Sequence, residues 1–316
     1  MKRISGNQPL SAGDRGAVAA IGNFDGVHRG HLAIIDRARG LAKIADAPLG
    51  VITFEPHPRA LFQPDALPFR LSCADTRAAA LAEIGVDVLY ELNFDHDFSQ
   101  FSAEEFATQV LRDHLGLKHL VVGYDFVFGH RRRGTPEMLV EMADELEMQV
   151  TRMDVVTEED GAAYSSTRIR QCLSEGDPKG ASALLGRPWE AVAEVVLGDQ
   201  RGRTLGFPTA NLRLGDLVHP AHGVYAVQAA LMDEDGPWIK GVANFGRRPT
   251  VNDLGPLLEV HLFDVSPDLY GKRLKVRLID FIRPEMKFDG LDALKAQIAQ
   301  DGETARQLLA VSAPSL

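Results

Sequence analysis

The sequence has few cysteines and no long apolar runs. Cys73 and Cys172 are its only cysteines among 316 residues, too few for a disulfide framework or a zinc site built from cysteines. No apolar run approaches the roughly 20 residues that a membrane-spanning helix needs. Residues 1–6, MKRISG, contain no apolar signal core. We therefore expect a cytoplasmic protein with no membrane partner.

Positively charged residues are also fewer than negatively charged ones. The chain has 34 Lys and Arg against 44 Asp and Glu, a formal net charge of −10. Proteins that bind nucleic acid by neutralising phosphates need the opposite balance, so no nucleic-acid partner is expected. A phosphate-bearing ligand would have to be held by backbone amides, a few basic residues and a metal ion.

The first part of the chain has the pattern of an α/β domain. Short apolar runs alternate with helical patterns, which is typical of an open, mostly parallel sheet. The runs are 17–21, 49–54, 86–92, 120–123 and 150–155. Helix starts are indicated by a capping box at 102–105, SAEE, and by the pairs Thr135-Pro136 and Asp177-Pro178. Ligands of such sheets bind beyond the carboxyl ends of the strands, so we expect the site in those loops.

The pattern changes after residues 186–188, GRP. Segments with a period of two now follow one another, separated by Gly and Pro turns. They are 191–197, 224–231, 238–244, 257–263 and 274–282. This spacing predicts a small antiparallel β-barrel, and one helical pattern closes the chain. A length of 316 residues also fits two domains, which we place at 1–186 and 187–316.

The segment 22–31, GNFDGVHRGH, follows the first predicted strand and opens a helix. His28 and His31 are three residues apart and can face one ligand, and a helix N-terminus attracts a polyphosphate. Taken alone, such a pair is more often two ordinary surface histidines, and a zinc pair is less favoured because no third ligand is near in sequence. A second anion site is indicated at 165–170, SSTRIR, after the fifth predicted strand.

The pairing of these two motifs is typical of the nucleotidyltransferase superfamily. Together with 53–58, TFEPHP, and 123–129, GYDFVFG, they resemble, in order, the FMN adenylyltransferase module of the prokaryotic bifunctional riboflavin kinase/FMN adenylyltransferase (FAD synthetase) family. The resemblance implies a Rossmann-like N-terminal domain with His28 and His31 as catalytic residues. It implies that ATP is bound by Gly22, Phe24, Asp25, His28, His31, Ser166, Thr167 and Arg168, and the flavin by Pro56, His57, Pro58 and Asp125.

The second half begins with 198–211, GDQRGRTLGFPTAN. Its glycines let a backbone bend around phosphates, but it is not a Walker loop, and such a string alone is more often a barrel turn than a site. The segments 223–225, 241–250, 258–263 and 281–285 continue a resemblance to the riboflavin kinase module of the same family. The resemblance implies a Mg–ATP site at Gly206, Pro208, Thr209 and Asn211, with Thr209 and Asn211 on Mg²⁺, and Glu259 as general base.

The resemblance predicts two reactions on small-molecule substrates. The barrel would phosphorylate riboflavin with ATP to FMN, and the first domain would adenylylate FMN with ATP to FAD and pyrophosphate. Another nucleotidyltransferase would leave the barrel unexplained, and an aminoacyl-tRNA synthetase fragment would need a Lys-rich signature loop. A non-catalytic flavin-binding module would be expected to lose some catalytic positions, which are all present. With no coiled-coil repeat, the expected state is a monomer or a transient oligomer.

Several segments have plainer explanations or none. The basic run 130–133, HRRR, could clamp phosphate but is more simply a solvated loop. Residues 158–161, EEDG, are most simply a charged turn. The loop 63–75 and the acidic hairpin 233–236 carry no assignment.

Overall fold

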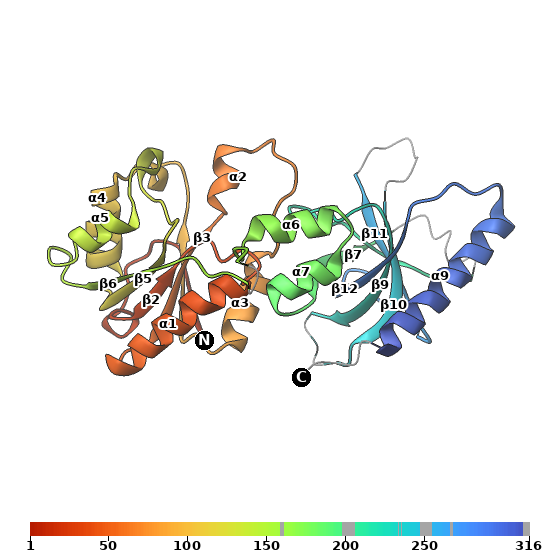
Figure 1. Cartoon of the computed structure of the whole chain (residues 1–316), viewed down its shortest axis with the longest axis horizontal. Helices are drawn as coiled ribbons and strands as arrows, with labels where there is room; N and C mark the ends of the chain where they lie inside the picture. The colour runs from red at the N-terminus through yellow and green to blue at the C-terminus, as the bar shows by residue number, and fades with distance from the viewer. Residues whose placement is uncertain are drawn as a thin grey trace. The chain divides into compact units, whose positions relative to one another are not determined.

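A computed structural model describes residues 1–158, 161–197, 206–232, 234, 236–246, 255–265 and 268–311. It divides into two compact units (Figure 1). The first comprises Met1–Ala66 with Ala74–Ser165, and the second comprises Leu67–Cys73 with Ser166–Leu316. Each unit contains its own sheet or barrel, and each is described by itself below.

The first unit is built on a six-stranded parallel sheet of order β1-β4-β3-β2-β5-β6. The strands are β1 (Lys2–Ser5), β2 (Val18–Ile21), β3 (Leu49–Glu55), β4 (Val88–Asn93), β5 (His119–Gly123) and β6 (Gln149–Met153). The predicted parallel sheet is confirmed. Strand β1 was missed because its sequence, KRIS, is short and has one apolar residue, as suits an edge strand.

Helices cover both faces of this sheet. On one face α1 (Arg29–Ile44) and α3 (Ala74–Glu83) pack against alternate residues of the central strands. On the other lie α4 (Ala103–Glu105), the π-helix η3 (Phe106–His114) and α5 (Pro136–Glu141). Shorter elements are η1 (Ala12–Asp14), α2 (Pro58–Phe62), η2 (Phe98–Gln100) and η4 (His130–Arg132). Two cores therefore form, one on each side of the sheet.

The predicted helix starts are confirmed. Ser102 Oγ accepts from the Glu105 N–H while Glu105 Oε2 accepts from the Ser102 N–H, which completes the capping box. The Thr135 hydroxyl accepts from the Met138 N–H. Each of these bonds satisfies a backbone donor that the first turn of a helix would otherwise leave unpaired.

The second unit is built on a closed antiparallel barrel of order β10-β11-β8-β7-β12-β9, as predicted. Its strands are β7 (Trp189–Val196), β8 (Ala210–Leu212), β9 (Gly223–Leu231), β10 (Ile239–Gly246), β11 (Leu257–Leu262) and β12 (Arg273–Pro284). The three-residue β8 was missed because it lies inside a segment interpreted as a phosphate-binding turn. The helices are α6 (Ser166–Ser174), α7 (Pro178–Leu185) and α9 (Leu291–Val311).

The compact units divide after Ser165, whereas the domain prediction places a boundary after Gly186. The reason is that α7 packs against β7 and β12, and α6 packs against α7. The Asp177 carboxylate caps α7 by accepting from the Gly180 N–H, as its sequence predicts. Packing therefore assigns α6 and α7 to the barrel unit, while the boundary at 186/187 stays a prediction about functional modules.

A part-buried ion pair fixes α9 to the barrel. Arg283, near the end of β12, donates from Nε and Nη2 to the two carboxylate oxygens of Asp301, at 2.9 and 2.6 Å. Next to this pair, Ala305 and Leu309 of α9 pack against apolar residues of β9 and β10. The helix is thus held by an apolar face, by this ion pair and by a second, exposed pair between Arg306 and Asp264.

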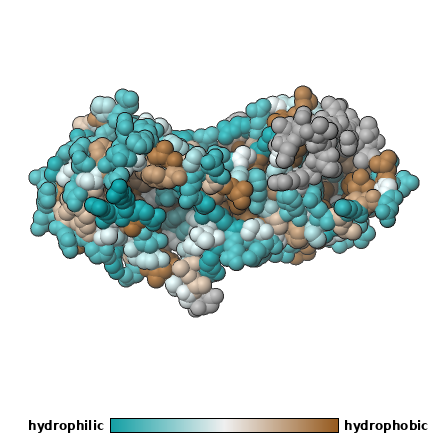
Figure 2. Space-filling model, turned by 90° about the horizontal axis from the view of Figure 1, so that it is seen from above, coloured by the Kyte–Doolittle hydropathy of each residue, from teal (hydrophilic) through white to brown (hydrophobic). Residues whose placement is uncertain are grey.

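None of the helices within the described residues is long and apolar enough to cross a membrane. On the face shown in Figure 2, hydrophilic residues predominate and hydrophobic ones form small, separate groups. That face therefore has the polar character expected from the composition.

We predict that Asp301→Ala weakens the barrel unit by about 1–3 kcal/mol, because it removes the carboxylate that accepts two hydrogen bonds from the half-buried Arg283 guanidinium. Urea unfolding followed by tryptophan fluorescence measures this directly, since both tryptophans of the chain, Trp189 and Trp238, lie in the barrel unit. Asp264→Ala is the control: it breaks the exposed pair between Arg306 and Asp264 and should change the midpoint little. Equal losses in both variants would contradict the anchoring role of Asp301.

Candidate functional site

A tight turn joins the end of β2 to α1. The Gly22 N–H donates to the Ile52 carbonyl, and the Thr53 hydroxyl donates to the Asn23 carbonyl, so the turn is tied to β3. Phe24 and Val27 have φ values of 47° and 45°, which are uncommon for residues with side chains. Such a conformation persists where the surrounding structure holds it, and it occurs most often at functional sites. Here both side chains are fully buried.

His28 and His31 cap each other at the start of α1. His28 Nδ1 accepts from the His31 N–H and His31 Nδ1 accepts from the His28 N–H, each at 3.3 Å. Their rings stack with centroids 3.6 Å apart. Because each Nδ1 accepts a hydrogen bond, the proton of each neutral ring belongs on Nε2, which is then a donor. Two Nε2–H groups at a helix N-terminus are suited to phosphate oxygens.

Gly30 lies between the two histidines in closely packed surroundings. A Cβ at this position would be 3.1 Å from Cε1 of His28 and 3.1 Å from Cβ of Tyr164. The His28 ring and the Tyr164 side chain therefore approach this glycine closely.

The second predicted anion motif starts α6. Ser166 and Arg168 are half-buried and Thr167 is exposed, all within the first turn of the helix. The structure therefore groups these three residues together, and groups His28 with His31, each set in its own compact unit. A joint ATP site of the two sets stays a prediction.

The predicted flavin residues follow the two strands that flank β2. Strand β3 continues into Pro56, His57 and Pro58, and β5 is followed by Asp125. Because β2 pairs in parallel with both β3 and β5, all three segments leave the same edge of the sheet. His57 is buried and its Nδ1 accepts from the Arg59 N–H, which starts α2. Asp125 is exposed.

A cluster of phenylalanines lies at this edge and was missed by the sequence analysis. Its rings, with neighbouring centroids about 5.4–6.5 Å apart, are Phe54, Phe94, Phe98, Phe106 and Phe128. Phe62 of α2 packs edge-on against Phe94 and leaves most of its own surface exposed. The sequence provides little indication of this cluster, because these phenylalanines are far apart in sequence and come together only in the folded chain.

The predicted kinase residues meet across three barrel strands. Asn211 of β8 is the direct register partner of Glu259 on β11, which in turn pairs with Asn244 of β10. Directly paired residues share one face of a sheet, so these side chains form a row. Thr209 directly precedes β8 and is two residues before Asn211. Asn211 is buried, while Thr209, Glu259 and Asn244 are half-buried.

A histidine secures the turn that carries Thr209. His261, two residues after Glu259, lies with Nδ1 2.9 Å from the Pro208 carbonyl, and its ring meets Phe207 edge-on. Gly206, just before, has a φ of 89°, which favours glycine. Neither His261 nor Asn244 was assigned a role from the sequence, because their relevance depends on strand register. Residues 198–205 and 247–254 of the predicted motifs lie outside the described residues.

The donor set near Glu259 fits a magnesium ion shared with substrate phosphates. Within the described ranges, no group of three or more His, Cys, Asp or Glu residues could hold a metal ion by itself. The Thr209 hydroxyl and the Asn211 amide oxygen are hard oxygen donors close to a carboxylate. Mg²⁺ commonly takes few protein ligands and completes its shell with water and phosphate oxygens.

Comparisons with known proteins match each part of the chain to a family of enzymes. Residues 10–168 match the family model described as FAD synthetase, and residues 185–309 match the model described as riboflavin kinase. The bifunctional riboflavin kinase/FMN adenylyltransferase of Escherichia coli (strain K12) is 42% identical over 316 residues, covering all of both chains. The protein of that name from Bacillus subtilis (strain 168) is 36% identical over 296 residues, covering 92% of this chain and 91% of its own.

A solved structure shares the fold along nearly the whole chain. A crystal structure described as a macrolide-efflux protein from Streptococcus pneumoniae aligns with a TM-score of 0.83 and 33% identity, covering 96% of this chain and 98% of its own. Fold and matches thus define a two-module enzyme, with a nucleotidyltransferase module before a kinase module. The chain belongs to the bifunctional riboflavin kinase/FMN adenylyltransferase family.

We predict that Gly30→Ala destabilises the first unit and lowers FAD formation, because the new methyl group displaces the His28 ring. Gly40→Ala is the matched control on the same helix, since a Cβ there meets nothing within 4 Å. That control should stabilise by about 0.5–1 kcal/mol, the usual gain of Ala over Gly in a helix. Thermal unfolding followed by circular dichroism, with the rate of FAD formation, measures both. Stabilisation by Gly30→Ala would contradict the close packing.

Proposed function

We propose that the two sites perform the family's two reactions with the residues described above. Residues 1–186 act as the FMN adenylyltransferase and residues 187–316 as the riboflavin kinase, on riboflavin, FMN and ATP. The observation that best supports this proposal is the register of the barrel. It places Asn211 beside Glu259, so a general base lies next to a hard oxygen donor for Mg–ATP.

In the adenylyltransferase the nucleophile is a phosphate oxygen of FMN. It attacks the α-phosphorus of ATP, a new P–O bond forms and the bond to pyrophosphate breaks. The second pKa of a phosphate monoester is about 6, so this oxygen is ionised at neutral pH and needs no protein base. What the site supplies is alignment and positive potential. The Nε2–H groups of His28 and His31 and the N-terminus of α1 provide donors, and Ser166, Thr167 and Arg168 add a second set.

Flavin binding at this site involves the edge that carries residues 56–58 and Asp125. The exposed ring of Phe62 follows that segment directly and offers an apolar surface on which an isoalloxazine ring can pack. The buried phenylalanines behind it hold this surface in place. The flavin is therefore bound largely by apolar contact, and its phosphate is directed toward the histidine pair.

In the kinase the nucleophile is the ribityl 5′-hydroxyl of riboflavin. An alcohol is a weak nucleophile, so Glu259 accepts its proton as the oxygen attacks the γ-phosphorus and ADP leaves. When bound at Thr209 and Asn211, Mg²⁺ supplies positive charge to the phosphate oxygens. His261 holds the turn before Thr209, and β8 holds Asn211 opposite the base.

A time course with riboflavin and Mg–ATP tests the proposal, with the flavins separated by chromatography. FMN appearing first, followed by FAD, supports two active sites in one chain. FMN as the final product would remove the adenylyltransferase assignment. FAD formed from added FMN, with riboflavin unchanged, would remove the kinase assignment.

We predict that Glu259→Gln lowers the kinase kcat by about 10²–10⁴-fold with little change in ATP binding, because the amide cannot accept the proton. Initial rates of FMN formation and equilibrium binding of an ATP analogue measure these two quantities. Glu190→Gln, on strand β7 of the same barrel, removes a carboxylate paired with Arg277 and should retain kinase activity. Full kinase activity in Glu259→Gln would remove Glu259 as the base.

We predict that His28→Ala or His31→Ala abolishes FAD formation and leaves FMN formation intact. Each substitution removes one phosphate donor and also one acceptor of the reciprocal cap. Rates of both reactions on the same sample separate a local effect from a general one. His96→Ala, which changes an exposed histidine paired with Asp97, should leave both rates unchanged. Equal loss of both activities would show that the two domains do not act independently.

A further inference from the structure

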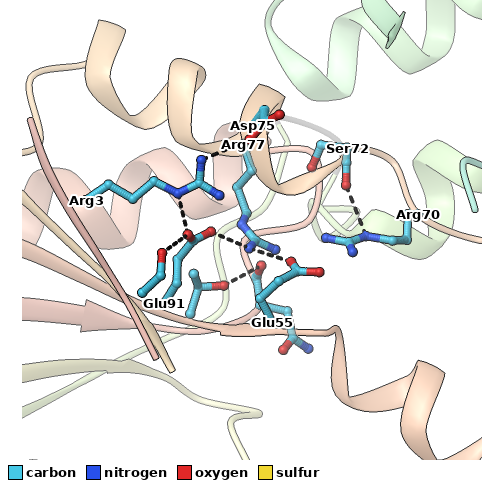
Figure 3. Close-up of polar contacts among 10 residues, drawn as sticks. Arg3, Glu55, Arg70, Ser72, Asp75, Arg77 and Glu91 are labelled. Carbon is cyan, nitrogen blue, oxygen red and sulfur yellow. Dashed lines mark hydrogen bonds and ion pairs between the residues drawn. The ribbon is translucent and has the colours of Figure 1, made fainter. Parts of the chain in front are cut away.

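A buried ionic network lies behind the predicted flavin segment and takes no part in the mechanism above (Figure 3). Arg77 of α3 is 1% exposed, and its Nη2 donates to Glu55 Oε2 at 2.9 Å and to Glu91 Oε1 at 3.1 Å. Glu91 of β4 is also buried, whereas the Glu55 side chain is 29% exposed. Arg77 therefore connects a fully buried carboxylate to one that reaches the edge of the sheet.

Arg3 of β1 completes the network on the other side of Glu91. Its Nε donates to Glu91 Oε2, and its Nη1 donates to Asp75 Oδ1 at 2.9 Å. The hydrogen bond to Glu91 raises the pKa of Arg3 above its usual value, so this guanidinium stays charged. Arg3 shares Glu91 with Arg77, and no contact between Arg3 and Glu55 is found in the described network (Figure 3).

Stability alone does not explain the hydrogen-bonding pattern of Arg77. Its Nε and Nη1 are buried and have no hydrogen-bond partner among the described residues. Buried donors without partners are unfavourable, and a buried ion pair by itself is weak evidence for stability. All the hydrogen bonds recorded for this guanidinium come from Nη2, which holds Glu55 and Glu91 together.

Glu55 is placed where its orientation matters. It is the last residue of β3 and directly precedes Pro56, His57 and Pro58. Its backbone carbonyl accepts from the Phe94 N–H at 3.2 Å, and its side chain is held by Arg77. Backbone and side chain together set the direction in which the chain leaves the sheet toward His57.

We propose that Arg77 is a positioning residue for flavin binding, acting through Glu55 on residues 56–58. This inference rests on the proposed flavin site. Arg77 contacts no substrate; it holds the end of β3 so that His57 and α2 keep their place. A displacement of about 1 Å at such a segment can cost up to about 10²-fold in a reaction that depends on alignment.

The test uses full-length variants assayed for FAD formation from FMN and Mg–ATP. Arg77→Met removes the guanidinium, Glu55→Ala removes its partner, and Arg77→Lys keeps the charge. We expect the KM for FMN to rise about tenfold or more in the first two, with a smaller change in kcat. The double variant should be no worse than the worse single one, because both act through one contact. Arg77→Lys should recover part of the loss.

Arg3→Met is the matched control, since it removes a cation from the same network without touching Glu55. It should leave the KM for FMN unchanged even if it lowers the melting temperature. Riboflavin kinase activity of every sample reports that the barrel unit is folded, and circular dichroism of the full chain reports any loss of helix in the first unit. If Arg77→Met does not fold, the KM for FMN of Glu55→Ala tests the proposal.

A KM for FMN unchanged in both Arg77→Met and Glu55→Ala overturns the inference. So does an equal rise in Arg3→Met, which would mean that any loss of the network acts through stability. His57→Ala separates this result from the site assignment. If His57→Ala raises the KM while the Arg77 and Glu55 variants do not, the flavin site stands and the positioning role falls. If His57→Ala has no effect, the flavin site falls and the positioning role with it.

Discussion

Complete burial of β2 is the constraint on which the first unit depends. All four residues of this strand are at most 2% exposed, with β3 on one side and β5 on the other and helices over both faces. A strand enclosed in this way reaches a ligand only beyond its carboxyl end. The residues able to bind one are therefore those of the turn after Ile21, the start of α1 and the segments that follow β3 and β5. The strained turn, the histidine cap and residues 56–58 all lie at that edge.

In the second unit the constraint is the register of the barrel strands. Closing a small barrel requires each strand to alternate its side chains between two faces in fixed register with its neighbours. Register places Asn211, Glu259 and Asn244 in one row, and His261 secures the turn before Thr209. Glu259 is half-buried, and its strand β11 pairs with β10 along its whole length and with β8 at residues 258–260. This pairing keeps the backbone of the proposed general base in place.

The two units also differ in the chemistry that they must supply. A phosphate nucleophile arrives ionised, so the proposed first site needs donors and positive potential. The Nε2–H groups of His28 and His31 are the proposed donors, and the N-terminus of α1 carries a partial positive charge. A hydroxyl nucleophile must lose a proton, so the second site needs a carboxylate. A net charge of −10 does not favour attraction of ATP over a broad surface, and both proposed sites instead rely on a few oriented groups. The proposed role of the Arg77 network is similar, because the network positions residues 56–58 and contacts no substrate.

The sequence by itself determined the parallel sheet, the barrel and the helix caps, and it predicted the motif residues of both sites. Local sequence patterns predict these features: periodicities of two and 3.6, capping pairs and contiguous motifs. Tertiary structure alone decided the rest. Strands β1 and β8 were too short to give a period, and the phenylalanine cluster joins residues from 54 to 128. The roles of Asn244, His261 and Arg77 depend on strand register and on contacts across α3, β3 and β4. Such contacts arise only when distant segments pack, so no local pattern carries them.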